Sequence, residues 1–150
     1  MQDGNPNSFL LDKHPTKSID DGHVNGSLTV IWREWDNIFP NHPKMVYVSS
    51  VNPGEIKGPH IHTRRNSYFT CIRGKVVFIL QNNDEFIEIE SSEENPIMVY
   101  VPKNVASAHV NLSESKSTIL SLADLAWRPN DNEMKNTLFP NYDWKKWQNI

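Results

Sequence analysis

The stretch Gly54-Glu55-Ile56-Lys57-Gly58-Pro59-His60-Ile61-His62 places two histidines one residue apart. Side chains two residues apart on a β-strand point to the same face, so His60 and His62 are expected to project side by side. Two imidazoles on one inward face are costly to bury without partners, so they should be hydrogen-bonded, bound to a metal or used in catalysis. The stretch therefore predicts a site on the inner face of a β-sheet.

Short strands dominate the rest of the chain. Runs rich in Val, Ile, Tyr and Phe are bounded by Asn, Pro and Gly, and no long stretch shows a helical period. Tight turns are expected at Arg73-Gly74 and at residues 82–84. About eight strands joined by such turns predict an all-β jelly roll or closed barrel. The expected strands cover residues 27–35, 44–51, 68–72, 75–81, 85–90, 97–101, 106–112 and 117–125.

The chain is expected to form one domain with an extension at its start. Its 150 residues suffice to bury a single core. Residues 1–26 are rich in Asn, Asp and Gly, and we expect an extended, partly loose N-terminal arm. Residues 27–150 should form the β-barrel domain. Its last part, residues 127–150, holds several aromatic side chains and should be a short helix or an irregular tail laid over the barrel.

Composition limits the classes of partner. The net charge of −3, from 15 basic and 18 acidic residues, gives no reason to expect nucleic acid or an anionic membrane. No apolar run reaches the length of a transmembrane helix. The single cysteine, Cys71, lies in an apolar run and is expected to be a buried structural thiol. Because one cysteine cannot form an internal disulfide, a cytoplasmic protein is expected.

The spacing around the histidine pair resembles the first sequence motif of the cupin family. Gly54 stands six positions before His60, and Gly74 follows twelve residues after His62. The position of the cupin glutamate, seven residues before the last glycine, is Ser67 here. The segment Pro102-Lys103-Asn104, with His109 downstream, resembles the second cupin motif, which is Pro-x-Gly followed by a histidine. The usual ligand position falls near Ser107, and His109, two residues further along, could face the same side of the strand.

Within the cupins, the chain resembles the dTDP-4-dehydrorhamnose 3,5-epimerases and the related dTDP-sugar 3,4-ketoisomerases, a metal-free branch. The resemblance spans about residues 46–147, and Gly58-Pro59-His60-Ile61-His62 is similar to the ketoisomerase motif Gly-x-His-x-His. It implies a nucleotide-linked 4-keto-6-deoxyhexose (a dTDP-sugar) as substrate, a homodimer with N-terminal strands at its interface, and a role in surface glycan biosynthesis. The segments that carry the resemblance to these enzymes also include Lys57-Gly58-Pro59-His60, Cys71-Ile72-Arg73-Gly74, Val101-Pro102-Lys103-Asn104, Leu112-Ser113-Glu114 and Trp127-Arg128-Pro129.

The chemistry of such a substrate suits the histidine pair. A hydrogen on the carbon next to a ketone is acidic enough for a side chain to remove, and histidine titrates near the working pH. We predict His60 as the general base and His62 as its partner, with no cofactor. The developing enolate oxygen needs a positive or hydrogen-bonding neighbour. Asp131, or alternatively Asp124, is a candidate to orient a catalytic histidine.

The chain departs from the epimerases at two positions. Ser67 stands where they have an enolate-stabilising lysine. Their tyrosine acid aligns with Trp127, whose indole N–H donates a hydrogen bond but does not titrate usefully. The missing positive charge could come from any of four nearby side chains, and an Arg64-Arg65 pair also suits a diphosphate. The expected substrate-binding residues are Lys57, Arg64, Arg65, Ser67, Arg73, His109 and Trp127.

Two other functions fit the sequence. His60, His62 and His109 could converge on zinc or another borderline metal with an open coordination position, although the glutamate position holds Ser67. The pocket could also belong to a sugar-nucleotide binding protein without activity. Our prediction is an isomerase that needs neither metal nor cofactor.

Overall fold

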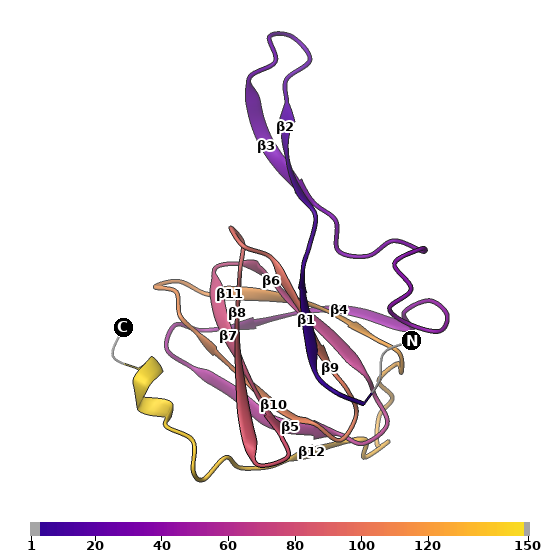
Figure 1. Cartoon of the computed structure of the whole chain (residues 1–150), viewed down its shortest axis with the longest axis vertical. Helices are drawn as coiled ribbons and strands as arrows, with labels where there is room; N and C mark the ends of the chain where they lie inside the picture. The colour runs from indigo at the N-terminus through magenta and orange to yellow at the C-terminus, as the bar shows by residue number, and fades with distance from the viewer. Residues whose placement is uncertain (1–3, 149–150) are drawn as a thin grey trace.

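Two five-stranded antiparallel sheets face each other in a jelly roll, as the computed structural model of residues 4–148 shows (Figure 1). The first sheet has the order β1-β9-β6-β11-β4, and the second has the order β12-β5-β10-β7-β8. This confirms the predicted all-β cupin-type fold. The strands of the first sheet are β1 (Asn7–Leu10), β4 (Met45–Val51), β6 (Ser67–Arg73), β9 (Ile97–Val101) and β11 (Ser117–Ala123). Those of the second are β5 (Ile56–His62), β7 (Lys75–Asn82), β8 (Glu85–Ser92), β10 (Ala106–Asn111) and β12 (Met134–Asn136).

A two-stranded hairpin projects away from the barrel near the start of the chain (Figure 1). Its strands are β2 (Lys13–Lys17) and β3 (Val24–Thr29), and within the described part of the chain they pair only with each other. The strand expected over residues 27–35 is therefore wrong in its bounds. The segment from residue 1 to 26 also contains β1, which pairs with β9 of the barrel. Residues 1–3 of the arm and 149–150 of the tail lie outside the described part of the chain.

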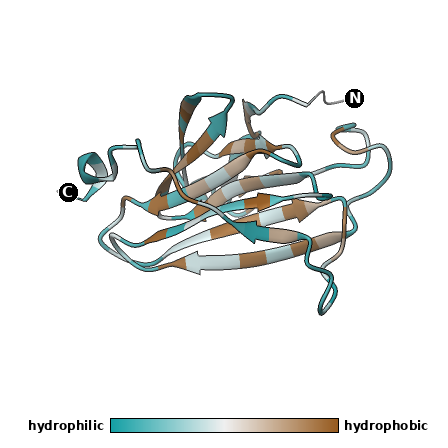
Figure 2. Cartoon of the chain, turned by 90° about the horizontal axis from the view of Figure 1, so that it is seen from below, coloured by the Kyte–Doolittle hydropathy of each residue, from teal (hydrophilic) through white to brown (hydrophobic). Residues whose placement is uncertain are grey.

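Alternation along the strands creates three apolar layers. In β7, Val76 and Phe78 pack into the core between the sheets, whereas Val77 and Ile79 belong to a cluster on the opposite face. The same alternation colours the strands in bands of apolar and polar residues (Figure 2). On the first sheet, Tyr68 packs with Leu11 and other apolar residues away from the central core. Each sheet thus carries apolar packing on part of its outer face as well as on its inner one.

The chain after the barrel covers the outer face of the second sheet. Phe139 packs with Phe86 and stacks on Trp144 at a ring distance of 6.0 Å. A 3-10 helix, η1 (Trp144–Trp147), ends this described segment, which agrees with the expected short helix or irregular tail. No helix among residues 4–148 is long and apolar enough to cross a membrane.

The expected turns differ in kind. Residues 83–84 join β7 to β8, which pair directly from Asn82 to Glu85, so this hairpin is confirmed. Arg73-Gly74 does not close a hairpin, because β6 and β7 belong to different sheets. Gly74 has a φ of 82°, and a Cβ there would lie 2.3 Å from Oγ of Ser117. The glycine therefore forms a corner that carries the chain from one sheet to the other.

Two adjacent residues offer a matched test of the C-terminal cover. Replacing Phe139, which is 3% exposed, by Ala should lower the free energy of unfolding, by about 3 kcal/mol, because the change leaves a cavity under the aromatic cluster. Leu138→Ala is the control, since Leu138 is 79% exposed and should lose little. Urea unfolding of both variants makes the comparison. Equal losses would contradict the proposed packing of this segment.

Candidate active site

A cavity of about 350 Å³ lies between the inner faces of the two sheets. Six of the residues singled out from the sequence line it, from β5, β10 and the loops after β5 and β11. The six are Lys57, His60, His62, Arg65, His109 and Trp127. The cavity is also lined by Tyr47 of β4, which the sequence analysis did not single out. Tyr47 lies on the same face of β4 as Met45 and Ser49.

Gly58 allows β5 to carry the histidine pair close to β10. It has a φ of 90°, and a Cβ at this position would lie 2.8 Å from the carbonyl oxygen of Ser107. Any larger residue would therefore push the two strands apart. His60 pairs with Ser107, and a register shift follows before His109. Ser107 and His109 both line the cavity, so the irregular pairing leaves both side chains at the site.

His62 is held by a buried carboxylate. Its Nδ1 donates to Oε1 of Glu133 over 2.6 Å, and Glu133 is 2% exposed. Burial alone would raise the pKa of Glu133, but hydrogen bonds from His62 and from the backbone N–H of Arg64 lower that pKa below its ordinary value. Burial lowers the pKa of His62, and this outweighs the opposing effect of Glu133. At neutral pH the pair is a carboxylate beside a neutral imidazole.

His60 is held by an amide. Its Nδ1 lies 2.9 Å from Oδ1 of Asn136, and an amide oxygen only accepts hydrogen bonds. The Nδ1 of His60 therefore carries the proton, and Nε2 has a free lone pair. The pairing of β12 with β5 sets Asn136 opposite His60 and Met134 opposite His62. One short strand thus positions the partners of both histidines.

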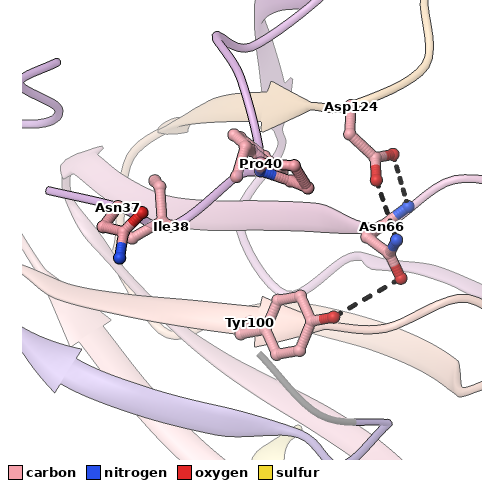
Figure 3. A pocket seen from close by; sticks show the side chains of 7 residues that line it. Asn37, Ile38, Pro40, Asn66, Tyr100 and Asp124 are labelled. Atoms are coloured by element: carbon pink, nitrogen blue, oxygen red, sulfur yellow. Dashed lines mark hydrogen bonds between the residues drawn. The ribbon is translucent and has the colours of Figure 1, made fainter. Parts of the chain in front are cut away.

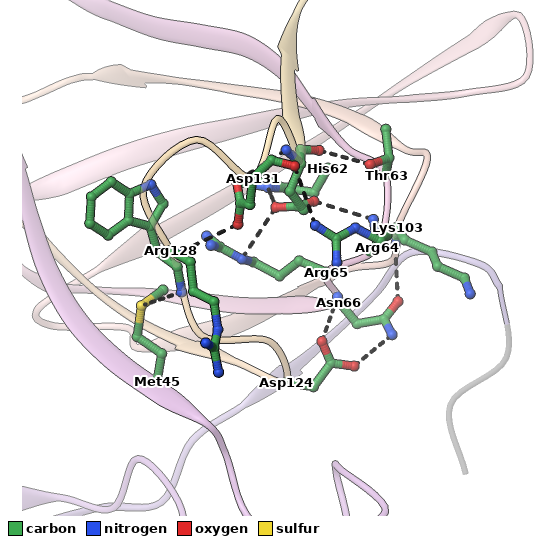
Figure 4. A network of polar contacts seen from close by, with 12 residues as sticks. Met45, His62, Thr63, Arg64, Arg65, Asn66, Lys103, Asp124, Arg128 and Asp131 are labelled. Atoms are coloured by element: carbon green, nitrogen blue, oxygen red, sulfur yellow. Dashed lines mark hydrogen bonds and ion pairs between the residues drawn. The ribbon is translucent and has the colours of Figure 1, made fainter.

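The two aspartates considered as histidine partners lie elsewhere. Asp131 accepts hydrogen bonds from the backbone N–H groups of Arg128 and Glu133, and Asp124 accepts from Asn66 (Figure 4). The carboxylate at His62 belongs to Glu133, two residues after Asp131. No local motif in the sequence distinguishes Glu133 from the other acidic residues, because its role depends on the pairing of β12 with β5.

The positive side chains near the site differ in burial. Arg65 is 5% exposed and lines the cavity. Lys57 also lines the cavity but is exposed, and its Nζ donates to the carbonyl oxygen of Ser50. Arg64 and Arg73 are exposed and do not line the cavity, and neither does the buried Ser67.

His109 is the third histidine of the cavity. Burial, followed by the charges of Lys57 and His60, lowers the pKa of His109 to about 4. Its Nε2 is buried without a hydrogen-bond partner among the described residues. Within that part of the chain, no three His, Cys, Asp or Glu side chains are arranged to hold a metal ion, and this includes His60, His62 and His109.

A second cavity, of about 390 Å³, lies beside the segment of residues 37–40 (Figure 3). It is also lined by Asn66, Tyr100 and Asp124, and Asn66 hydrogen-bonds to both of the others. The described residues around it include no histidine. The chemistry that the histidine pair offers therefore belongs to the cavity between the sheets.

The jelly roll, with its histidine pair on an inner strand, defines a protein of the cupin class. A sequence profile of the FdtA family, described as WxcM-like, C-terminal, matches residues 13–143. The chain belongs to this family, which confirms the resemblance found in the sequence. No curated protein matches the chain.

Solved structures of two sugar isomerases and of a capsular polysaccharide assembling protein share the fold. QdtA, a sugar 3,4-ketoisomerase of Thermoanaerobacterium thermosaccharolyticum solved with TDP, is 22% identical, with a TM-score of 0.70 over 89% of this chain and 88% of that one. A dTDP sugar isomerase of Desulfovibrio desulfuricans is 13% identical, with a TM-score of 0.75 over 92% and 90%. CapF, a capsular polysaccharide assembling protein of Staphylococcus aureus, is 25% identical over 63% of this chain, with a TM-score of 0.60, and the match spans 26% of CapF.

The low pKa of His109 predicts a loss of stability in acid. The unfolded chain takes up a proton at this residue near pH 6.5, whereas the folded protein does so at about pH 4. The unfolded state therefore binds more protons in this window, so stability should fall as the pH drops from 6.5 toward 4.

His109→Gln should reduce that loss, because glutamine does not titrate. The measurement is the midpoint of thermal unfolding at neutral and at mildly acidic pH. His14→Gln is the control, since His14 is exposed on β2 and this variant should keep the wild-type dependence. An acid loss in His109→Gln as large as in the control would contradict the assignment.

Proposed function

We propose that the chain is an isomerase that moves a proton next to the ketone of a nucleotide-linked 4-keto-6-deoxyhexose, without a cofactor. The observation that carries this proposal is the pair of imidazoles side by side in one cavity, each held through Nδ1. Both Nε2 atoms are left to exchange protons with a bound sugar. Such an arrangement positions two groups in advance, which is worth most in proton transfers.

His60 takes the proton from the carbon next to the ketone. The electrons of the broken C–H bond form a C=C bond, and the carbonyl electrons move onto the oxygen to give an enolate. Return of the proton to the same carbon from the other face would be an epimerisation. Return to the former carbonyl carbon moves the ketone along the ring, and this ketoisomerisation also transfers a proton from the neighbouring hydroxyl to the enolate oxygen.

His62 suits the second transfer, between the two oxygens. Its hydrogen bond to Glu133 stabilises the imidazolium that forms while the proton is in transit. His60 and His62 together therefore supply both transfers of a ketoisomerisation. The tyrosine acid of the epimerases aligns with Trp127, whose indole N–H is not a useful proton donor in catalysis. Ketoisomerisation is therefore better supported than epimerisation.

The chemistry of the similar proteins supports a dTDP-sugar as substrate. A histidine-to-asparagine mutant of QdtA was solved with TDP-4-keto-6-deoxyglucose, and ChmJ, a 3'-monoepimerase of Streptomyces bikiniensis, with dTDP-quinovose. Lys57, exposed where it lines the cavity, is the proposed contact for the diphosphate. CapF supports a role in the assembly of surface polysaccharide. The buried, unpaired Cys71 agrees with a cytoplasmic location.

Three variants test the proposal with TDP-4-keto-6-deoxyglucose in heavy water. The wild-type protein should introduce deuterium next to the ketone, and His60→Asn should lower the rate of exchange by about 10²-fold or more. His62→Asn should keep exchange but lose the isomerised product. His23→Asn is the control, because His23 is exposed in the hairpin and should not affect the reaction. Nuclear magnetic resonance locates the deuterium and the ketone.

A wild-type protein that binds dTDP but catalyses no exchange would refute the proposal, and the chain would then be a binding protein. Loss of exchange on chelation, with one tightly bound metal per chain, would instead favour the metal-dependent alternative.

A homodimer is the proposed assembly. The β2–β3 hairpin leaves Val24 and Leu28 61% and 52% exposed, and it pairs with no other strand among residues 4–148. A second copy of the chain would cover these side chains, as the family resemblance implies. Such coverage removes apolar surface from water and stabilises an otherwise isolated two-stranded hairpin.

Light scattering at micromolar concentration should therefore show a dimer, and Leu28→Asp should shift it toward monomer. Leu138→Asp makes the same exchange at a leucine that is 79% exposed outside the hairpin, and this variant should stay dimeric. A monomeric wild-type protein would contradict the proposed assembly.

A further inference from the structure

Arg65 is a buried cation with incomplete pairing. Arg65 is 5% exposed and lines the cavity. The Nε of its guanidinium has no hydrogen-bond partner among the described residues. Its nearest counter-charge is Oε1 of Glu133, 3.5 Å from that Nε, and this same oxygen already accepts from His62. A buried N–H donor of a charged group is costly to leave without a partner. The arrangement points to a ligand oxygen that completes the site.

The other positive side chains near the site fit this role less well. Among residues 4–148, Arg65 is the one Lys or Arg whose side chain is buried. Lys57 is exposed, and its Nζ already donates to a carbonyl oxygen. A charge screened by water stabilises a developing negative charge far less than one in a water-excluded site.

The charges of the site balance when the enolate forms. Before the reaction, the carboxylate of Glu133 neutralises the guanidinium of Arg65, and His62 is neutral because burial lowers its pKa. Removal of the carbon proton creates one imidazolium and one enolate oxygen. Arg65 lies within the same group of side chains as His62 (Figure 4), so it can donate to that oxygen while Glu133 supports the imidazole.

We propose that Arg65 is a catalytic residue that donates a hydrogen bond to the carbonyl oxygen of the bound sugar and stabilises the enolate formed there. This inference rests on the proposed function and deepens it, since it names the group that replaces the epimerases' lysine. In the balanced step, the carbon proton goes to His60, the C–H electrons form the C=C bond, and the carbonyl electrons move onto the oxygen held by Arg65. In the ketoisomerisation, His62 then passes the proton of the neighbouring hydroxyl to this oxygen, the carbon proton returns to the former carbonyl carbon, and the new C=O bond forms at the neighbouring carbon. Arg65 is unchanged.

The test compares turnover with nucleotide binding. Arg65→Gln removes the charge, and Arg65→Lys keeps it without the two-pronged geometry. With TDP-4-keto-6-deoxyglucose at saturation, exchange should fall by about 10²-fold or more in Arg65→Gln and by less in Arg65→Lys. The Kd of dTDP, measured by calorimetry, should stay unchanged in both. Lys116→Gln, which removes one positive charge from an exposed turn, should keep the wild-type rate.

A second readout separates this role from a structural one. The charge of Arg65 lowers the pKa of His62, so Arg65→Gln should raise that pKa, as measured by nuclear magnetic resonance. If Arg65→Gln does not fold, Arg65→Lys alone decides the question through its rate of exchange and its Kd for dTDP.

Either of two results would overturn the inference while leaving the proposed function intact. One is wild-type exchange at saturation in the Arg65 variants. The other is weakened dTDP binding with a normal saturated rate, which would assign Arg65 to the diphosphate. A wild-type protein without exchange would refute the proposed function, and this inference with it.

Discussion

The hydrogen bond between His62 and the buried carboxylate of Glu133 is the interaction on which the site depends. It joins β5 to the residue that precedes β12, across 71 positions of sequence. The backbone around it is also tied together, because the carbonyl oxygen of Glu133 accepts from the N–H and the hydroxyl of Thr63. Removing the carboxylate would leave a half-buried imidazole and a buried guanidinium without their common partner. Such uncompensated groups are among the costliest defects in a folded protein.

The architecture of the barrel explains why this charged group is tolerated. The core between the sheets is apolar around Phe78, Val99 and Ile119, and the polar side chains of the site lie in the cavity that adjoins it. Apolar clusters also pack against the outer faces of both sheets. Hydrogen bonds from Nδ1 to Asn136 and Glu133 hold the two imidazoles in fixed orientations. Two proton transfers on one sugar require that fixed geometry.

The sequence predicts the fold well because the evidence for it is local. Alternation of apolar and polar residues and turn residues at 82–84 identify β7 and β8 almost to their ends. The hairpin strand β2 escapes prediction, because Lys13-His14-Pro15-Thr16-Lys17 buries no apolar face. The three-residue strand β12 is too short to show a period.

Some residues of the site can also be found from local sequence, whereas others cannot. The His60 and His62 pair can be found from its spacing, since two residues on one strand share a face. Glu133 and Asn136 cannot, because only long-range strand pairing brings them to β5. The sequence likewise offers four positive residues and no means of choosing among them. Burial in the folded chain distinguishes Arg65 from its neighbour Arg64.

A crystal structure of the protein with TDP-4-keto-6-deoxyglucose tests the central claim most directly, because that claim is a statement about where the sugar binds. We predict the hexose in the cavity between the sheets, with the carbon next to its ketone about 3–3.5 Å from Nε2 of His60. The ketone oxygen should accept from Arg65. A hexose bound in the cavity of Asn66, Tyr100 and Asp124, or a metal ion held by His60, His62 and His109, would contradict the account.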